Sequence, residues 1–330
     1  MTVEPVLLDV KDLKVHFDVP AGGILFKKTV PLKAVDGVSF QIKAGETLGV
    51  VGESGCGKST LGRAILRLIE PSAGEAIWLG RDLASIHHKQ MQALRADLQI
   101  IFQDPLASLD PRMTIGQIIS EPLITHRPEL TKAQVRDEVR EIMERVGLLP
   151  DMINRYAHEF SGGQCQRIGI ARAMILRPKL IVCDEAVSAL DVSIQAQIVN
   201  LLQELQREFG LALLFISHDL SVVRHISHRI LVLYLGNVME IADRDTIYNA
   251  PKHPYTKALI SAVPIPDPIL ERNKERIVLT GELPSPINPP SGCVFRTRCP
   301  FAREKCATDV PKIEFLGPKH QVACHFHNEM

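Results

Sequence analysis

The chain has 330 residues, of which 45% are hydrophobic and 23% charged, with a formal net charge of +0 and a pI of about 7.2. This length exceeds one average domain, and the composition is typical of a soluble globular protein. The neutral charge balance argues against a nucleic-acid binder that relies on bulk attraction. The first ten residues lack the basic start of a signal peptide, and no apolar run approaches the ~18 residues that span a membrane. We therefore expect a cytoplasmic protein with reduced cysteines.

The pattern of the N-terminal part predicts strands followed by one helix. Residues 5–17 alternate roughly as a strand, whereas residues 18–33 contain Gly, Pro and Lys and predict an exposed loop. Residues 34–42 and 46–51 predict two more strands, joined by a turn at residues 43–45. A helix should begin at Lys58 and run to about Ile69, because Pro71 would end it.

The next part alternates helices with short apolar runs. A helix with one apolar face is predicted after Thr131, which is a suitable cap. The runs at 180–183, 211–216 and 229–235 are continuous and apolar, and they are separated by helix-like segments. This pattern predicts a buried, mainly parallel sheet.

The character of the chain changes near Pro251, after which proline is dense and periodicity fades. We therefore predict two domains, residues 1–250 and a smaller extension over 251–330.

A glycine-rich segment, "GESGCGKST", follows the apolar strand at 46–51 and precedes a helix. It matches the P-loop pattern, whose glycines let backbone N–H groups face phosphate oxygens. Lys58 should reach the β- and γ-phosphates, and the Ser59 hydroxyl should bind Mg²⁺. A glycine turn with an incidental lysine is the alternative, which this context disfavours. The expected ATP-binding residues of the loop are Gly52, Glu53, Ser54, Gly55, Cys56, Gly57, Lys58, Ser59 and Thr60.

Two acids, Asp184 and Glu185, follow the apolar run at 180–183. The carboxyl end of a parallel strand is where such sheets present polar groups to a ligand. Asp184 suits a role in the magnesium shell, and Glu185 could polarise a water that attacks the γ-phosphate. Taken alone, this stretch could also be two solvated acids at the end of a strand. The P-loop in the same chain favours the interpretation in which they serve a nucleotide site.

The stretch "EFSGGQCQR" resembles the signature motif of ABC-type ATPases. Physically, Ser161 would cap a helix whose first N–H groups face a phosphate. A chain that already has a P-loop would use this second cradle for a partner's nucleotide. The resemblance implies that two such domains sandwich two ATP molecules, and that the signature residues Ser161, Gly162, Gly163 and Gln164 act on the partner's ATP.

Four further positions match this family. Gln103 is similar to the Q-loop glutamine, which senses Mg²⁺ and faces the membrane subunits, and Asp191 ends a stretch similar to the D-loop. His218 is similar to the switch histidine at the γ-phosphate, and Phe17 to the aromatic that stacks on adenine. A structural histidine and a core aromatic are the alternatives for His218 and Phe17. The resemblance thus implies Lys58, Glu185 and His218 as catalytic residues and Ser59, Gln103 and Asp184 as the magnesium set.

The fold implied is an α/β P-loop NTPase of ABC type. It has a RecA-like core with a mainly parallel sheet, an N-terminal antiparallel β subdomain, an α-helical signature subdomain and a small cysteine-containing extension. The motifs "HPYTKALISAVP" and "GELPSPINPPSGC" resemble the C-terminal extension of ATPases from peptide and nickel importers, closest to the F-type subunit of oligopeptide permeases.

The family's architecture implies the partners and the location. A sister D-type ATPase would form a heterodimer with this chain beneath two membrane-spanning permease subunits, and a periplasmic or surface peptide-binding protein would deliver the substrate. The chain would lie peripherally at the cytoplasmic face of the inner membrane, with ATP and Mg²⁺ as cofactors and without nucleic acid as a partner.

Two alanines depart from the family pattern, because Ala186 and Ala157 stand where proline is usual. Proline restricts the backbone, so Ala186 could loosen the turn towards the D-loop, but no reacting group is lost. Other functions considered are an ABC ATPase without a transporter, an exporter, an importer of another solute such as nickel, and a cysteine-based redox module.

Four of the seven cysteines lie in the last forty residues: Cys293, Cys299, Cys306 and Cys324. Their spacing matches neither short zinc-ribbon pairs nor the common ferredoxin runs, so spacing alone leaves free thiols as an even alternative. A proline-rich segment with little core would benefit from a metal clip. The family resemblance implies a [4Fe–4S] cluster held by the four thiolates, with zinc or no metal as alternatives. His325 and His327 are alternative ligands but are expected to be exposed. Cys56, Cys165 and Cys183 lie within the ATPase motifs and are not expected to bind this metal.

Overall fold

The computed structural model describes residues 5–20, 29–264 and 267–329. The chain forms two compact units. The first unit is built mainly from Ser85–Ile216, and the second from Val6–Ile42, Leu48–Ala84 and Ser217–Met330.

Three parallel strands form the sheet of the first unit. These are β6 (Leu98–Ile101), β7 (Leu180–Asp184) and β8 (Ala212–Ile216), with Leu98 opposite Leu180 and Leu180 opposite Ala212. Helix α6 (Val192–Phe209) connects β7 to β8, as parallel neighbours require. The prediction of buried parallel strands over 180–183 and 211–216 is confirmed.

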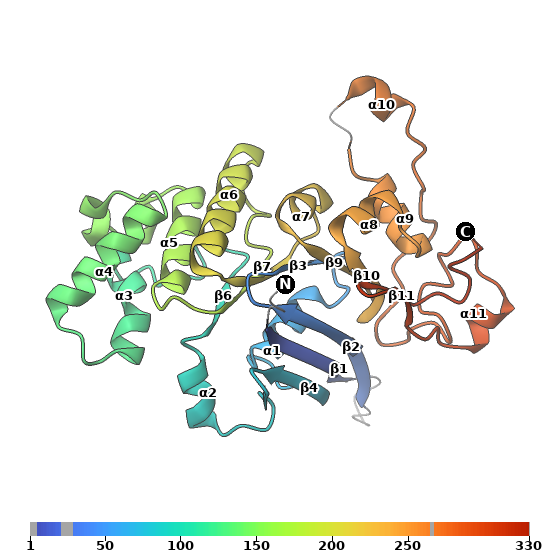
Figure 1. Ribbon diagram of the computed structural model, residues 1–330, viewed down its shortest axis with the longest axis horizontal. Helices are drawn as coiled ribbons and strands as arrows, with labels where there is room; N and C mark the ends of the chain where they lie inside the picture. Colours follow the sequence, from blue (N-terminus) through green and yellow to red (C-terminus); the bar gives the residue numbers. More distant parts are fainter. Residues whose placement is uncertain (1–4, 21–28, 265–266, 330) are drawn as a thin grey trace. The chain divides into compact units, whose positions relative to one another are not determined.

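A helical group in the same unit contains α3 (Ile115–His126), α4 (Lys132–Arg145) and α5 (Gly162–Met174), which lie together in Figure 1. All three begin with a capping box, in which a Ser or Thr side chain and a Gln three residues later satisfy each other's backbone N–H groups. The predicted cap at Thr131 is confirmed. The unit also contains the short elements α2 (His88–Leu94), η1 (Pro150–Asn154) and η2 (Ala157–Glu159).

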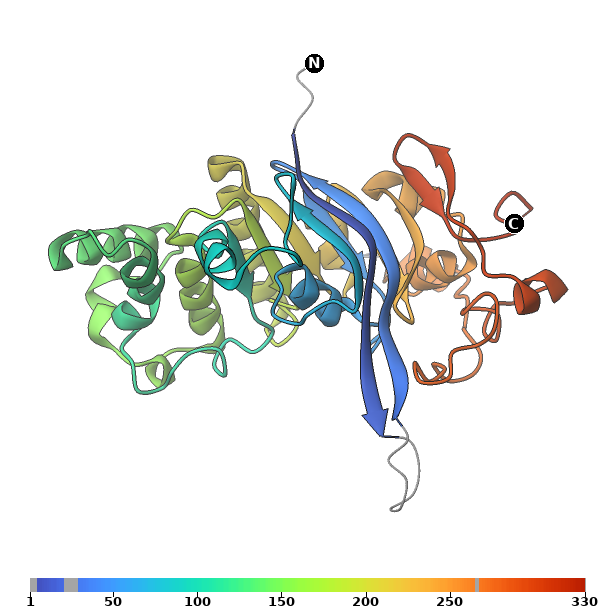
Figure 2. The same ribbon diagram turned by 90° about the horizontal axis from the view of Figure 1, so that it is seen from below.

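The second unit contains the predicted N-terminal antiparallel sheet. Its strand order is β2 (Thr29–Lys43), β1 (Val6–Pro20), β4 (Ala73–Trp78) and β5 (Arg81–Asp82). Figure 2 shows β1 and β2 as long curved ribbons side by side. The loop predicted over 18–33 is wrong at both ends, because backbone pairing carries β1 to Pro20 and begins β2 at Thr29. Residues 21–28 lie outside the described part.

A second sheet in this unit pairs β3 (Thr47–Val51) in parallel with β9 (Arg229–Tyr234), and β9 antiparallel with β10 (Asn237–Asp243). Helix α1 (Lys58–Ile65) follows β3, and α7 (Leu220–Ile226) precedes β9. The predicted start at Lys58 is confirmed, but the helix ends four residues before the predicted Ile69. Arg67, just beyond it, has a left-handed backbone with φ of 50°, which a continuing helix does not allow.

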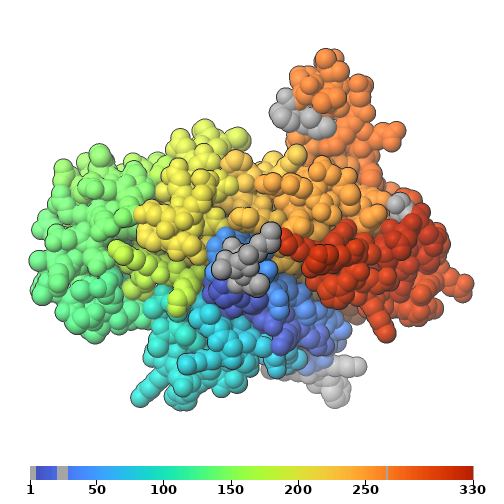
Figure 3. Space-filling view, in the orientation of Figure 1, coloured from blue at the N-terminus to red at the C-terminus, as the bar shows by residue number. Residues whose placement is uncertain are grey.

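The C-terminal extension adds two strands to the same sheet. Strand β12 (His320–Val322) pairs with β10, placing Val322 opposite Glu240, and β11 (Glu314–Gly317) pairs with β12. The helices of this region are α8 (Arg244–Asn249), α9 (Pro254–Ser261), α10 (Pro268–Arg272) and α11 (Glu304–Thr308). In Figure 3 the segment around α10 projects from the remainder of the second unit.

A buried carboxylate ties the extension to β10. Glu240 is fully buried and accepts hydrogen bonds from the backbone N–H groups of Lys252 (2.8 Å) and His253 (2.9 Å). The ring of His320 lies 2.8 Å from the same carboxylate. One side chain therefore holds both the entry to α9 and the first residue of β12.

Candidate functional site

The P-loop lies between β3 and α1, and close backbone packing explains its glycines. A Cβ atom on Gly57 would come 2.0 Å from the Ala34 carbonyl oxygen, and φ at Gly57 is 103°. A Cβ atom on Gly52 would come 2.2 Å from the Leu233 carbonyl oxygen. Both positions therefore exclude other residues.

The Lys58 ammonium is held by its own loop. Its Nζ donates to the carbonyl oxygens of Gly52 (2.9 Å) and Glu53 (3.0 Å), and only 3% of the residue is exposed. These bonds place the amine in the curl of the loop, while Ser54 and Gly55 remain exposed. The loop thus combines a positioned cation with an open backbone, which are the features that bind phosphate.

The Cys56 thiol of the P-loop is buried in the interior of the second unit. It is 1% exposed, and this burial raises its pKa from 9.0 to about 11, although the nearby Lys58 acts in the opposite direction. The thiol is therefore protonated and inert at neutral pH.

Phe17 is 39% exposed on β1, so the alternative of a core aromatic does not hold. An exposed ring on a strand is available for stacking on a planar base.

The acid pair and Gln103 come together in the first unit. Asp184 is buried at the end of β7, and Glu185 follows it with a left-handed backbone at φ of 51°. The Gln103 side-chain amide donates a hydrogen bond of 3.0 Å to Glu185 Oε2. The structure thus places the glutamine expected to sense Mg²⁺ directly on the carboxylate expected to activate water. His218, in the second unit, is exposed just after β8.

The signature residues form the first turn of α5. Ser161 is the N-cap, and its hydroxyl accepts from the backbone N–H of Gln164. Ser161 and Gly162 are exposed, so the positive end of a 13-residue helix faces solvent. Asp191 is the exposed N-cap residue of α6, and the next residue, Val192, is 82% exposed.

The two alanines that replace proline are both 1% exposed. Ala157 is the first residue of η2, where proline would also fit, and its carbonyl oxygen lies 3.5 Å from the Cys165 thiol. Ala186 lies in the turn after Glu185.

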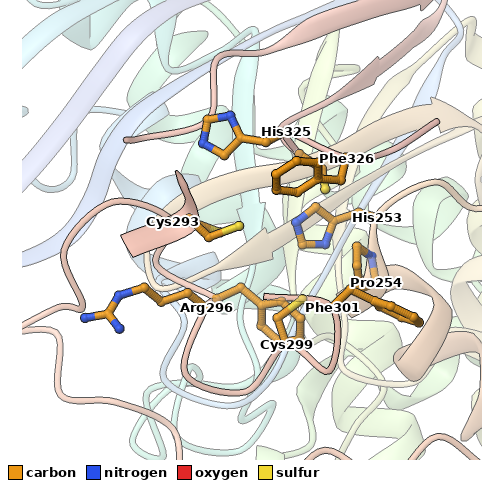
Figure 4. Close-up of a pocket in the computed structure, with 11 residues that line it drawn as sticks. His253, Pro254, Cys293, Arg296, Cys299, Phe301, His325 and Phe326 are labelled. Carbon is orange, nitrogen blue, oxygen red and sulfur yellow. The ribbon is translucent and has the colours of Figure 1, made fainter. Parts of the chain in front are cut away.

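The four C-terminal cysteines line one cavity, together with three phenylalanines (Figure 4). They arrive from separate stretches: Cys306 belongs to α11, and Cys324 follows β12. The backbone N–H of Cys293 donates to the Cys306 carbonyl oxygen at 2.8 Å, which ties two of these stretches together. The residues that line the cavity include no other cysteine.

A Cys-x-Phe pattern recurs at three of these cysteines. The backbone amides of Phe295, Phe301 and Phe326 hydrogen-bond to the thiols of Cys293, Cys299 and Cys324, respectively, and favour the thiolate. Burial is the larger effect on each thiol and raises all three pKa values, that of Cys293 to about 11. Among the described residues, no group of three or more His, Cys, Asp or Glu side chains is positioned to hold a metal ion.

The expectation of two exposed histidines is wrong for His327, which is 3% exposed and bonded through Nδ1 to the Cys324 carbonyl oxygen at 3.0 Å. His325 is half-buried and lines the cavity. Sequence reasoning missed His253, which also lines the cavity; it is fully buried, and burial lowers its pKa to about 3. The motif "HPYTKAL" contains this histidine and could have directed attention to it.

The P-loop, the acid pair and a signature helix define an ATPase of ABC type. A family model described as "ABC transporter" matches residues 35–188, and one described as "Oligopeptide/dipeptide transporter, C-terminal region" matches residues 239–306. The fold is similar to that of cbiO1 from Clostridium perfringens, with a TM-score of 0.64 and 25% identity over 75% of this chain and 92% of that one. It is equally similar (TM-score 0.64, 27% identity, 72% and 99% coverage) to a dimeric ATP-binding cassette bound to ADP and Pi.

The relatives define the particular family. The chain is 63% identical to the oligopeptide transport ATP-binding protein OppF of Salmonella typhimurium, over 97% of this chain and 96% of the relative. It is 53% identical to the oligopeptide transport ATP-binding protein AppF of Bacillus subtilis, over 98% of each chain. The chain therefore belongs to the family of oligopeptide transport ATP-binding proteins of ABC transporters.

Over the residues that the structure describes, none of the helices combines the length and apolar composition needed to cross a bilayer.

Proposed function

We propose that this chain hydrolyses ATP to drive the uptake of oligopeptides through an ABC import complex. The observation that carries the proposal is the presence, in one chain, of an ABC ATPase region over 35–188 and a peptide-transporter region over 239–306. An importer of nickel or another solute and an ABC ATPase outside transport are the alternatives. The match over nearly the whole chain to relatives named for oligopeptide transport favours peptide import over both alternatives.

In the proposed reaction, Glu185 polarises the attacking water, while Lys58 and His218 stabilise charge on the γ-phosphate. The contact between Gln103 and Glu185 supports this role, because it orients the carboxylate before substrate arrives. Phe17 would stack on adenine, and the P-loop amides would bind the phosphates. The motifs from the P-loop to the acid pair all fall within the matched ABC region.

The proposed magnesium set consists of Ser59, Asp184 and Gln103. A hydroxyl, a carboxylate and an amide oxygen are the hard donors that Mg²⁺ prefers, so the residues present fit the ion. When bound, Mg²⁺ would neutralise charge on the β- and γ-phosphates.

The exposed signature turn supports action on a partner's nucleotide, since Ser161 and Gly162 face solvent. We assign that partner to a sister D-type ATPase, with Asp191 and the exposed Val192 at the shared surface. The complex would contain two permease subunits and a periplasmic or surface peptide-binding protein. The chain would then lie peripherally at the cytoplasmic face of the inner membrane.

The segment after Gln103 is suited to contact the permease. Leu106 and Ile124 are large apolar side chains that are mainly exposed on the first unit. Arg172 of α5 donates to the Ser108 carbonyl oxygen at 2.6 Å, which links this segment to the signature helix. A movement of the signature helix would therefore reach the apolar surface.

Glu185→Gln tests the enzymatic role. This variant should bind ATP normally but lose ATPase activity in the assembled complex by on the order of a hundredfold or more. Peptide uptake by a deletion strain that carries the variant should be lost as well. Undiminished ATPase activity would remove Glu185 from its assigned role, and normal peptide uptake in a strain lacking the chain would remove the transport function.

We also propose that residues 251–330 act as an accessory region in which Cys293, Cys299, Cys306 and Cys324 hold a [4Fe–4S] cluster. The donor set fits: four thiols line one cavity, and backbone amides donate to three of them. Hydrogen bonds to sulfur are typical of cluster sites. The four thiolates would hold the cluster and would thereby join the separate stretches of chain that carry them.

The cluster is tested on full-length protein purified without oxygen. Iron and sulfide in near-equal amounts, with visible absorbance that Cys299→Ser removes, would support it. Zinc in place of iron would support the alternative metal, and metal-free protein with four alkylatable thiols would refute both. Cys165→Ser, which removes a buried thiol of the first unit, is the matched control.

A further inference from the structure

The P-loop contains a carboxylate, Glu53, at its second position. A carboxylate in a loop that binds a polyanion would repel that ligand unless it is neutralised. In this structure a guanidinium does so: Arg298 Nη1 donates to both carboxylate oxygens of Glu53, at 2.9 and 2.8 Å. Arg298 lies 245 residues further along the chain, beside Cys299 in the C-terminal extension.

The backbone of Glu53 is held as well. Its N–H donates to the hydroxyl oxygen of Tyr255 at 3.0 Å, and its carbonyl oxygen accepts from Lys58 Nζ at 3.0 Å. The side chain and backbone N–H of this loop residue are thus bound by residues that follow position 250. Its carbonyl oxygen also accepts from the Cys56 backbone N–H at 3.3 Å, and Lys58 is the lysine that should move to the phosphates.

A buried cluster of three aromatic rings supports the contact between Arg298 and Glu53. The rings of Tyr234, Tyr255 and Phe295 are fully buried and pack edge-on or tilted, with centroids 4.8 to 5.3 Å apart. The backbone N–H of Arg298 donates to the Phe295 carbonyl oxygen at 3.0 Å, and its guanidinium lies 6.0 Å from the Tyr234 ring. Only 10% of the Arg298 side chain is exposed, so its position is set by packing and does not depend on solvent.

We propose that Arg298 is a positioning residue for ATP binding: it neutralises Glu53 and, together with Tyr255, holds the P-loop in its open curl. The C-terminal extension thereby sets the nucleotide affinity of the ATPase region. The proposal rests on the P-loop being the nucleotide site proposed above, and it is independent of any metal on the cysteines.

This role predicts an unusual pattern among variants. Arg298→Gln leaves the Glu53 carboxylate facing the incoming triphosphate without its counter-charge, so ATP should bind about tenfold more weakly. Removing the carboxylate as well, in Glu53→Gln/Arg298→Gln, should restore binding to within about twofold of the wild type. High salt should shrink the deficit of Arg298→Gln, because it screens partly exposed charges.

The matched control is Arg303→Gln. Arg303 also belongs to the extension, pairs with a carboxylate (Glu329, 2.6 Å) and lies over an aromatic ring (Phe326, 4.2 Å). Like Arg298 it combines an ion pair with an aromatic contact, but its side chain is 51% exposed and its carboxylate partner lies in the extension and not in the P-loop.

The experiment measures the Kd of a fluorescent ATP analogue for the full-length chain at low and high salt, in these variants and in Lys58→Ala. Weaker binding by Arg298→Gln, with rescue in the double variant and no effect in Arg303→Gln, is the expected result. A double variant as weak as Arg298→Gln, or equal binding by Arg298→Gln and Arg303→Gln, would overturn the inference while leaving the nucleotide site intact. Unchanged binding by Lys58→Ala would remove the proposed site, and the inference with it.

Discussion

The side-chain amide of Gln103 lies 3.0 Å from the Glu185 carboxylate, although 82 residues separate the two in sequence. The bond joins the start of the segment proposed to contact the permease to the residue proposed to activate water. A signal that moves Gln103 would therefore change the orientation of the carboxylate.

The first prediction follows from this contact. Gln103→Ala should lower ATPase activity of the assembled complex about tenfold or more while ATP still binds, since Glu185 loses its orienting partner. Steady-state ATPase rates with and without peptide-loaded binding protein measure the effect. Gln99→Ala is the control, because Gln99 lies on β6 four residues before Gln103 and its side-chain amide donates to the Arg95 carbonyl oxygen at the end of α2. A normal rate in Gln103→Ala would contradict an orienting role.

The second prediction concerns the signature turn. A Cβ atom on Gly163 would lie 2.7 Å from the Ile194 Cγ2 atom, so Gly163→Ala should displace the first turn of α5. We expect a loss of ATPase activity on the order of a hundredfold in the complex, with normal ATP binding to the chain's own P-loop. Ile194→Ala in the same chain should restore part of the activity by making room. If the double variant is as inactive as the single one, the clash between the added methyl group and Ile194 does not cause the loss. The methyl group would then act by blocking the partner's phosphate.

The third prediction concerns the buried Glu240. Glu240→Gln replaces one acceptor oxygen by a donor, so at least one of the three contacts to Lys252, His253 and His320 is lost. The variant should be about 1–3 kcal/mol less stable, with faster amide exchange over α9 and β12 than elsewhere. Asp243→Asn is the control, because Asp243, on the same strand, forms an exposed pair with Lys319 at 3.5 Å, and neutralising it should change stability little. Uniform exchange in Glu240→Gln would show that the carboxylate does not anchor the extension.

The fourth prediction is a pH dependence at Cys56. Burial raises its pKa from 9.0 to about 11, so the folded state holds this proton more tightly than the unfolded chain. The resulting stability is fully present below pH 9 and is lost as the pH rises towards 11. Between pH 8 and pH 10.5 the free energy of unfolding of the wild type should fall by about 2 kcal/mol relative to Cys56→Ala. Parallel curves for the two proteins in urea titrations would contradict the buried, protonated thiol.

Helix caps and buried strands could be predicted from the sequence, because interactions between residues close in sequence, or the apolar composition of a short run, determine them. Thr131 and Ser161 cap helices because a side-chain oxygen reaches an amide three residues away, and this needs no distant partner. The apolar runs at 180–183 and 211–216 became buried parallel strands for a similar reason, since their composition excludes an exposed position. Strand ends were less predictable. Pro20 and Thr29 belong to β1 and β2, which are neighbours in one sheet, and residue composition does not predict where such pairing ends.

The sequence by itself determined that this chain is an ABC-type ATPase with a peptide-transporter extension, because its phosphate loop, acid pair and signature turn are each short and contiguous. Only the tertiary structure decided how the extension meets the ATPase motifs. Arg298 and Glu53 are 245 residues apart, and His327 is buried and bonded to Cys324 although the polar residues Asn328 and Glu329 follow it in sequence. An ion pair or a buried ring depends on which backbone segments pack together, and charge and spacing along the chain do not specify that packing.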